Sequence, residues 1–319
     1  MFGIWSRLRR LGIVGMNQRN ADYILRYNKR SLYPLVDDKL RTKYLAIESG
    51  IAVPALYGVI EIQHDVANLP NIVKDHHDFV IKPAHGSGGN GICVITGRLN
   101  ERYRQNNGDL LTEDAIGYHI SNILSGLYSL GGQPDQALIE YRVKFDPLFE
   151  TVSFRGVPDI RTIVFRGVPV ACMVRLPTRM SDGKANLHQG AVGAGIDLAT
   201  GRTTHAVWQN SPVTQHPDTG AVISGLEIPH WHKLLTLAAQ CHDLVGLGYL
   251  GVDVVLDRDL GPLVLELNAR PGLSIQIANG RGLSNVLAQI EKMDTIPTSA
   301  AERATLGQKL SLGGCPRTD

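Results

Sequence analysis

Three oxygen-bearing side chains in the last third of the sequence have the spacing of a divalent-metal site. Asp253 and Glu266 lie in two apolar runs that flank RDLG at 258–261. In a regular hairpin around that loop, Asp253 lies opposite Glu266, and Asn268 shares the face of Glu266 because side chains alternate along a strand. Facing carboxylates destabilise a strand pair, and such oxygens are the ligands that Mg²⁺ prefers. The pattern predicts a site for Mg²⁺ or Mn²⁺, and the apolar flanks disfavour its alternative, a solvated outer face.

A glycine-rich run at 82–95, KPAHGSGGNGICVI, has the residue types of a phosphate-binding loop. Three of its glycines fit the spacing G-x-G-x-x-G of a dinucleotide turn: Gly86, Gly88 and Gly91. That turn needs a helix to begin within the glycines, whereas the residues at 92–96 predict a strand, and no Lys-Ser or Lys-Thr follows to make a Walker A loop. The run therefore predicts a β-hairpin whose glycines let backbone N–H groups approach phosphates. An ordinary hairpin loop is the alternative on this segment alone.

Apolar periodicity and capping residues predict the elements that position these groups. The expected helices lie at 17–33, from Asp37 or Asp38 to Gly50, at 113–126 and at 231–245. The expected strands lie at 79–83, 92–97, 137–143 and 160–175, the last folded as a hairpin. A long polar loop is expected at 176–195.

Composition limits the class of protein. The chain has 319 residues, of which 43% are hydrophobic and 19% charged, which is typical of a globular protein large enough for two lobes. A net charge of +2 predicts no nucleic-acid partner. Ten Lys or Arg against three Asp or Glu at 1–43 predict a solvated helical face, or less readily a peripheral contact with an acidic surface or membrane. Four scattered cysteines, no signal peptide and no transmembrane run predict a cytoplasmic location.

Five motifs stand in the order in which they occur in the ATP-grasp superfamily. Lys82 precedes the glycine-rich hairpin, and IEY at 139–141, DIR at 159–161, GVD at 251–253 and ELNARPG at 266–272 follow. The DIR stretch, NLHQGA at 186–191 and the two last strands most resemble RimK-type alpha-L-glutamate ligases. The resemblance covers residues 37–285 and implies an α+β ATP-grasp fold, in which two α+β lobes hold ATP between them after a short helical N-terminal extension.

The resemblance also implies a division of the chain into four parts. These are a basic N-terminal extension at 1–36, a smaller lobe with the glycine-rich hairpin at 37–135, a larger lobe with the metal site at 136–292, and a loosely attached C-terminal tail at 293–319.

Roles for individual residues follow from the same resemblance. Those that would bind ATP are Lys39, Lys82, Gly86, Ser87, Gly88, Gly89, Gly91, Glu140, Tyr141, Val143, Asp146, Lys184 and Asn186. Within this set Lys82 would hold phosphates and the backbone at 140–143 would meet adenine, whereas Asp146 would hold the ribose or only form a turn before Pro147. The residues that would bind Mg²⁺ are Asp253, Glu266 and Asn268. His188 would be a general base or an exposed loop histidine.

Three arginines would face an anionic substrate or the developing acyl phosphate: Arg161, Arg175 and Arg270. Guanidinium groups suit this task because they bind carboxylates and phosphates through two parallel hydrogen bonds. A strict two-residue turn at 166–167 puts Arg161 and Arg175 on opposite faces of their hairpin. Either Pro169 forces a bulge or one of these two arginines is structural.

The implied reaction is ATP-dependent ligation of a carboxylate to an amine. ATP phosphorylates the carboxylate, and the amine attacks the acyl phosphate to give an amide, ADP and phosphate, for which metal ions, a lysine and arginines suffice. The resemblance implies glutamate or a similar amino acid as the added group, and a small molecule, a peptide or a protein as its acceptor. A non-catalytic ATP-binding module and a kinase with the same nucleotide site are the alternatives, whereas a dinucleotide-dependent oxidoreductase leaves the three metal-site residues unexplained.

Overall fold

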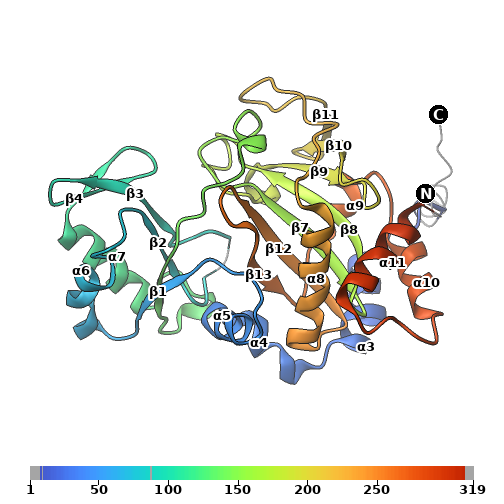
Figure 1. The fold of residues 1–319 in the computed structure, drawn as a ribbon, viewed down its shortest axis with the longest axis horizontal. Helices are drawn as coiled ribbons and strands as arrows, with labels where there is room; N and C mark the ends of the chain where they lie inside the picture. The colour runs from blue at the N-terminus through green and yellow to red at the C-terminus, as the bar shows by residue number, and fades with distance from the viewer. Residues whose placement is uncertain (1–7, 9, 87, 313–319) are drawn as a thin grey trace. The chain divides into compact units, whose positions relative to one another are not determined.

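The computed structural model describes residues 8, 10–86 and 88–312, which form two compact units. The smaller unit consists of Asp38–Tyr44 and Val53–Lys144, and the larger unit contains the rest of the described chain. Figure 1 labels most of the helices and strands of both units. Helix α5 (Lys39–Glu48) passes from the smaller unit into the larger one after Tyr44. Among the described residues, no helix has the length and hydropathy that a membrane crossing needs.

An antiparallel sheet of six strands, in the order β1-β6-β2-β3-β4-β5, is the centre of the smaller unit. The strands are β1 (Leu56–Ile60), β2 (Phe79–Pro83), β3 (Cys93–Leu99), β4 (Arg102–Gln105), β5 (Leu110–Leu111) and β6 (Ala137–Glu140). Helix α7 (Glu113–Leu124) packs on this sheet through one helical stripe, Ile116, Ile120 and Ile123. Thr112 caps α7 because its hydroxyl accepts a hydrogen bond from the amide of Ala115 at 3.2 Å. The short helices of this unit are η3 (Gln63–Asn68), α6 (Leu69–Ile72) and η4 (Leu130–Gly132).

The register of the smaller sheet confirms the hairpin expected around the glycines and corrects one boundary. β2 and β3 are antiparallel, with Phe79 opposite Ile95 and Ile81 opposite Cys93. Strand β6 pairs with β1 on one side and with β2 on the other, so it lies inside this sheet. The boundary expected between 135 and 136 is therefore wrong, and the smaller unit extends to Lys144.

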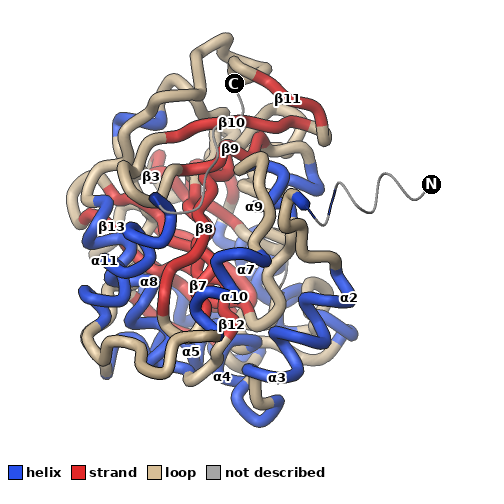
Figure 2. The backbone as a smooth tube through the Cα atoms, turned by 90° about the vertical axis from the view of Figure 1, so that its right-hand side faces the viewer, coloured by secondary structure: helices blue, strands red, loops and turns tan. Residues whose placement is uncertain are grey.

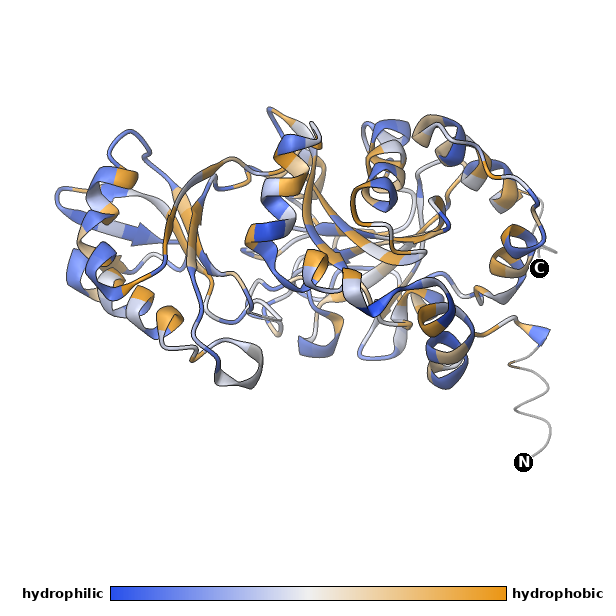
Figure 3. Ribbon diagram, turned by 90° about the horizontal axis from the view of Figure 1, so that it is seen from below, coloured by the Kyte–Doolittle hydropathy of each residue, from blue (hydrophilic) through white to orange (hydrophobic). Residues whose placement is uncertain are grey.

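A second antiparallel sheet, of seven strands in the order β11-β10-β9-β8-β7-β12-β13, is the centre of the larger unit. The strands are β7 (Asp159–Phe165), β8 (Val168–Leu176), β9 (Val192–Ile196), β10 (Thr203–Trp208), β11 (Ser211–Val213), β12 (Tyr249–Asp257) and β13 (Gly261–Asn268). Helix α8 (Trp231–Val245), at the predicted position, packs along the sheet, and the short helices η5 (Pro147–Phe149) and η6 (Leu187–Gln189) lie in its connections. Figure 2 shows β7, β8 and β12 side by side, with α10 (Ser284–Glu291) packed on them. In Figure 3 these strands are mostly hydrophobic, whereas the helices are of mixed hydropathy, as amphipathic helices are.

The expected loop at 176–195 ends in a strand, β9, which the sequence does not reveal because its residues are VGAGI. One of them, Gly195, is a glycine for a steric reason. A side chain at Gly195 would lie 2.6 Å from the carbonyl oxygen of Ala278, at the end of α9 (Ser274–Ala278). Helix α9 packs so closely on the sheet there that a β-branched residue, which is usual in a strand, would not fit.

The helix expected at 17–33 is confirmed as far as Tyr27 and wrong beyond it. Residues 16–27 are helical without interruption, as α2 (Met16–Gln18), the π-helix η1 (Arg19–Ile24) and α3 (Leu25–Tyr27). After a break at 28–29, two short helices follow, η2 (Arg30–Leu32) and α4 (Pro34–Asp37). The break at Asn28 has a physical cause, because this buried amide exchanges two hydrogen bonds of 2.7 and 2.8 Å with the backbone of Tyr249. The ring of Tyr23 lies 5.6 Å from that of Phe165. Residues 16–37 are therefore part of the larger unit and not a separate extension, and residues 1–7 and 9 lie outside the described residues.

The segment expected as a loose C-terminal tail also packs on the larger unit. Helix α11 (Ala300–Leu312) contacts α8 and β8. Arg303 is 4% exposed, donates to the carbonyl oxygens of Gly167 and Thr298 at 3.2 and 2.7 Å, and pairs with Asp243. Because a buried arginine needs such partners, this helix is held firmly, and the prediction of a loose tail is wrong for residues up to 312. Residues 313–319 lie outside the described part.

Candidate functional site

The glycine-rich loop of the smaller unit needs its glycines for conformation and for space. Gly88, Gly89 and Gly91 have φ of 63°, 76° and 75°, in the left-handed region that other residues rarely adopt. A side chain at Gly91 would also lie 2.6 Å from the ring of Tyr128. Ser87, which we predicted to bind ATP, lies outside the described residues. The loop is therefore a tight turn of mostly bare backbone, as the phosphate-covering prediction requires.

Side chains from two helices fix both ends of this loop. Lys39, at the start of α5, donates from Nζ to the carbonyl oxygen of Gly86 at 2.6 Å. At the other end, Nε2 of His119 on α7 lies 3.0 Å from the carbonyl oxygen of Gly91. Burial lowers the pKa of His119, and this hydrogen bond opposes the decrease only in part. Lys39, predicted to bind ATP directly, is thus placed to position the loop.

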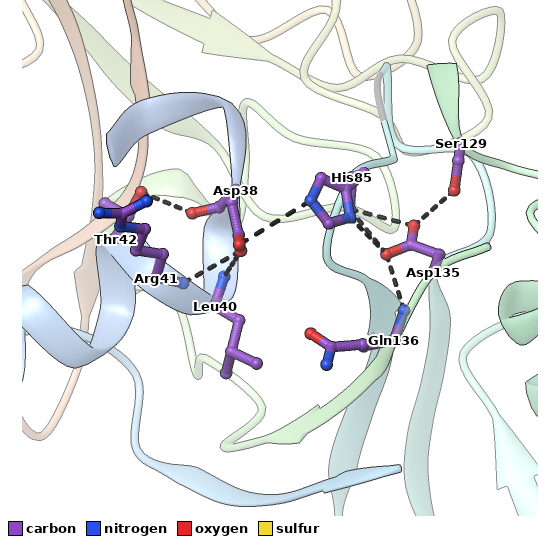
Figure 4. A network of polar contacts seen from close by, with 8 residues as sticks. All are labelled: Asp38, Leu40, Arg41, Thr42, His85, Ser129, Asp135 and Gln136. Carbon is purple, nitrogen blue, oxygen red and sulfur yellow. Dashed lines mark hydrogen bonds and ion pairs between the residues drawn. The ribbon is translucent and has the colours of Figure 1, made fainter. Parts of the chain in front are cut away.

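A polar network also holds the base of the loop (Figure 4). The buried carboxylate of Asp135 accepts from the amide of His85 at 3.0 Å and from Ser129 Oγ at 2.6 Å. His85 Nδ1 lies 2.8 Å from Asp135, and since an ionised carboxylate can only accept, Nδ1 carries the proton. Burial raises the pKa of Asp135, but the hydrogen bonds from Ser129, His85 and Gln136 outweigh burial and lower it. Sequence reasoning missed this network because His85 and Asp135 are 50 residues apart in the chain.

A buried cluster of two lysines and a glutamate lies in the same unit. Glu140 Oε1 lies 2.5 Å from Lys82 Nζ and Glu140 Oε2 lies 2.7 Å from Lys43 Nζ, with all three side chains at most 6% exposed. Burial lowers the pKa of Lys43 to about 8, and the attraction of Glu140 only partly opposes this effect. Sequence reasoning found Lys82 and Glu140 but missed Lys43, whose spacing of four residues from Lys39 on α5 was the available signal.

The three residues predicted to bind a metal lie on β12 and β13 of the larger unit. Asp253 is opposite Glu266, as predicted, and Asn268 is opposite Gly251. The regular hairpin that led to this pairing is wrong in detail. A bulge between Asp253 and Val254 compensates for a shorter turn, which closes with Asp257 opposite Gly261.

Two arginines hold Asp253. Arg161 donates from Nε to Oδ1 at 2.7 Å and from Nη2 to Oδ2 at 2.6 Å, and Arg175 donates from Nη2 to Oδ2 at 2.7 Å. Both arginines therefore lie on one face. The cause is a bulge in β8, where Val164 pairs with Pro169 but Ile163 pairs with Ala171, and this confirms the first of the two alternatives left open by the sequence.

A second aspartate completes this arginine–aspartate cluster. Asp159 accepts from Nε and Nη2 of Arg175, both at 2.5 Å. Burial raises the pKa of Asp159 to about 6, and Arg175 opposes this increase. Burial also raises the pKa of Asp253, but Arg161 and Arg175 together lower it to about 2. Asp253 is consequently ionised at neutral pH.

The oxygen atoms of this strand pair suit a hard divalent cation. A carboxylate has about four lone-pair sites. The arginine N–H groups use three of those on Asp253, which leaves one on Oδ1. Asn268 Oδ1 accepts from the amide of Arg270 at 2.9 Å and keeps a second lone pair. Within the described part of the chain, no group of three or more His, Cys, Asp or Glu could hold a metal. The three residues predicted to bind a metal offer two carboxylates and one amide.

The other predicted site residues have structural contacts, and their roles toward ATP or substrate stay predictions. Asp146 caps η5, because its Oδ1 accepts from the amide of Leu148 at 2.9 Å. Asn186 caps η6 in the same way through the amide of His188, at 3.0 Å. The remaining ones lie as follows: Tyr141 donates its amide to Ala55, Val143 is buried, Lys184 donates its amide to Ser181, and Arg270 lies over the ring of Tyr33.

The chain is an ATP-grasp protein by comparison with known families. More narrowly, it belongs to the family described as sugar-transfer associated ATP-grasp, whose profile matches residues 18–292. It is 23% identical over 258 residues to a probable alpha-L-glutamate ligase of Aeromonas salmonicida, and 25% identical over 269 residues to one of Aliivibrio salmonicida. These matches cover 79% and 84% of the chain, which spans 62% and 65% of those relatives.

Solved structures of ATP-grasp ligases are also similar to the chain. D-alanine–D-alanine ligase from Bacillus anthracis matches 87% of this chain and 70% of its own, with 15% identity and a TM-score of 0.45. The ATP-grasp ligase PsnB with its minimal precursor matches 83% of this chain and 63% of its own, with 15% identity and a TM-score of 0.44.

Proposed function

We propose that this chain is an ADP-forming ATP-dependent ligase that joins a carboxylate to an amine. The observation that carries the proposal is the register of β12 and β13, which sets Asp253 opposite Glu266 beside two arginines on the same face. Facing carboxylates are unfavourable unless cations offset them. Membership of an ATP-grasp family supports ATP as the phosphoryl donor.

Asp253, Glu266 and Asn268 would hold Mg²⁺, which when bound would offset the charge of the transferred phosphoryl group. Arg161 and Arg175 would act on the substrate side. Their two aspartate partners fix them, and Asp159 and Asp253 raise the pKa of Arg175 despite its burial, so it stays charged at any working pH. The N–H groups of these arginines that the aspartates do not use would donate hydrogen bonds to the charge that develops on an acyl phosphate.

Lys43 and Lys82 of the smaller unit would bind the phosphates of ATP, and the glycine-rich backbone would cover them. Two buried lysines share one glutamate, so this cluster has a surplus of one positive charge. An anion that enters would replace part of the contact with Glu140. The loop contributes N–H groups, which its anchors at Lys39 and His119 hold in place.

We propose glutamate or a similar amino acid as the group that is added. The support is the name of the two curated relatives, of which this chain spans less than two thirds. The acceptor would be a small molecule, a peptide or a protein.

The test is ADP release from Mg²⁺-ATP with a panel of carboxylates and amines, for the native protein, Glu266→Gln and a control, Glu227→Gln. Glu227 is an exposed glutamate of the larger unit, paired with Arg202, so its loss affects only the surface. ADP release that needs a carboxylate, is trapped as a hydroxamate by hydroxylamine, and is lost only in Glu266→Gln establishes the ligase. A stable phosphorylated product without an amine indicates a kinase, and ATP binding without turnover indicates a binding module.

A further inference from the structure

A cavity of about 580 Å³ lies wholly within the larger unit, apart from the residues assigned to ATP and metal. Three arginines line it: Arg19, Arg30 and Arg270. Its apolar wall comes from Ile24 and Leu25. A volume of this size holds a small organic molecule and is much larger than a single inorganic ion needs.

The charge of this cavity is not balanced by the protein. In the part of the chain that the structure describes, no carboxylate pairs with any of these three arginines. Arg19 donates only to neutral groups, the side chain of Asn20 and the carbonyl oxygen of Pro271. The guanidinium of Arg270 lies 5.4 Å from the ring centre of Tyr33. By contrast, Arg161 and Arg175 of the same unit are each paired with aspartates.

The cavity is built by fixed groups. Three hydrogen bonds of 2.8 to 3.1 Å hold the guanidinium of Arg19, so its orientation is set without a ligand. Arg19 opens the π-helix η1, an element that is rare and occurs frequently at functional sites. On the other side, the side chain of Asn268 accepts from the amide of Arg270 and fixes the loop that follows β13. Arg270, which lines the cavity, is therefore two residues beyond Asn268, the last of the predicted metal residues on β13.

We propose that this cavity binds the anionic part of the substrate, a small organic acid with at least two negative groups, carboxylate or phosphate. Three guanidinium groups without acidic partners supply the charge, and their paired N–H groups match both anions. Ile24 and Leu25 contact the carbon skeleton. That the bound anion is a substrate rests on the proposed ligase function. That the cavity binds an anion does not depend on it.

Calorimetric titration without ATP or metal, at low salt, tests the binding. The probes are glutarate and 1,3-propanediol bisphosphate, each with two negative groups, and glutaramide and 1,3-propanediol are their uncharged counterparts. The variants are Arg30→Gln and Arg270→Gln, whose exposed side chains leave no buried gap when shortened. The control is Arg26→Gln, on the same segment but outside the cavity, where Arg26 pairs with Glu291 at 3.3 Å.

We expect each charged probe to bind the native protein more tightly than its uncharged counterpart. Arg30→Gln and Arg270→Gln should each weaken binding about tenfold, the usual effect of losing one charge-assisted hydrogen bond, and Arg26→Gln should not. Whichever charged probe binds tighter identifies carboxylate or phosphate as the preferred group. Equal binding of charged and uncharged probes, or an equal loss in Arg26→Gln, would overturn the proposal.

A second measurement separates this proposal from the ligase function. If anion binding depends on Arg30 but no carboxylate and amine support ADP release, the cavity stands as an anion site and the ligase function fails. If ligation occurs and Arg30→Gln raises KM for the carboxylate without lowering kcat, both proposals are supported. If ligation occurs with an unchanged KM in Arg30→Gln, the cavity is not the substrate site.

Discussion

Replacing Glu140 by glutamine tests the lysine cluster of the smaller unit. Glutamine has nearly the same shape but no charge, so the change leaves two ammonium groups, which now lie 2.5 and 2.7 Å from the carboxylate, without a counter-charge. Removing one partner of a buried ion pair typically costs about 3–5 kcal/mol. All three side chains are at most 6% exposed, so solvent cannot screen the loss. We expect Glu140→Gln to lower the free energy of unfolding of the smaller unit by this amount at pH 6.

The pH dependence of this loss can be derived from Lys43. Burial lowers its pKa to about 8 in the native protein, and removing the attraction of Glu140 lowers it further. In the pH window between the pKa of Lys43 in the folded variant and pH 8, Lys43 of the folded variant has lost its proton. Lys43 of the unfolded chain and of the native protein still bind that proton in this window. By linkage, the stability of the variant rises with pH in that window, while that of the native protein does not. The deficit of Glu140→Gln should therefore shrink from pH 6 to pH 8.

Hydrogen exchange of β2 and β6, followed in urea from pH 6 to 8, measures the stability of the smaller unit. The control is Glu227→Gln, an exposed pair that should change stability by less than about 1 kcal/mol. Added tripolyphosphate should restore more stability to Glu140→Gln than to the native protein if the lysines bind phosphates. A deficit below about 1 kcal/mol, or one that grows with pH, would refute the reasoning.

Two further predictions concern single residues. Gly91→Ala should destabilise the smaller unit by more than about 1 kcal/mol in urea unfolding, because φ is 75° and a methyl group would lie 2.6 Å from Tyr128. Gly108→Ala is the control for backbone strain alone, since Gly108 has φ of 99° but open space around it. Equal losses of stability in the two variants would exclude a contribution from the clash. Folded Asp159, with a pKa raised by burial to about 6, keeps a proton that the unfolded chain releases near pH 4, so native stability relative to Asp159→Asn should fall by about 2 kcal/mol from pH 4 to 6. A stability difference in thermal unfolding that does not change with pH would contradict this.

Local patterns in the sequence were enough to predict the elements whose signals lie within a few residues. The hairpin around the glycines and helix α8 are confirmed, because β-branched runs, turn residues and a 3.6-residue stripe are short-range features. The helix expected at 17–33 ends early, after Tyr27, and the reason is long-range. Asn28 bonds to the backbone of Tyr249, 221 residues away, and that contact decides where the helix breaks.

Some contacts of the candidate site could likewise be predicted from short-range patterns, and others depend on long-range features of the fold. Asp253 opposite Glu266 was predictable, because a bulge and a shorter turn cancel and leave that pair in register. The position of Arg175 was left open, because a bulge in β8 shifts which face it takes, and no count along the sequence shows a bulge. Lys43 was missed because it is far from Glu140 in the sequence and only the fold brings the two side chains together. Lys82, the other partner of Glu140, lies on the neighbouring strand β2.

The two charged clusters differ in a way that bears on what each can bind. Arg161, Arg175, Asp159 and Asp253 balance when ionised, so this cluster adds no net charge to the strand pair that carries Glu266. Glu266 lies opposite Asp253 in the register of β12 and β13, and carboxylate oxygens are the ligands that a hard divalent cation prefers. Lys43, Lys82 and Glu140 keep one positive charge in a buried place, which favours an anion.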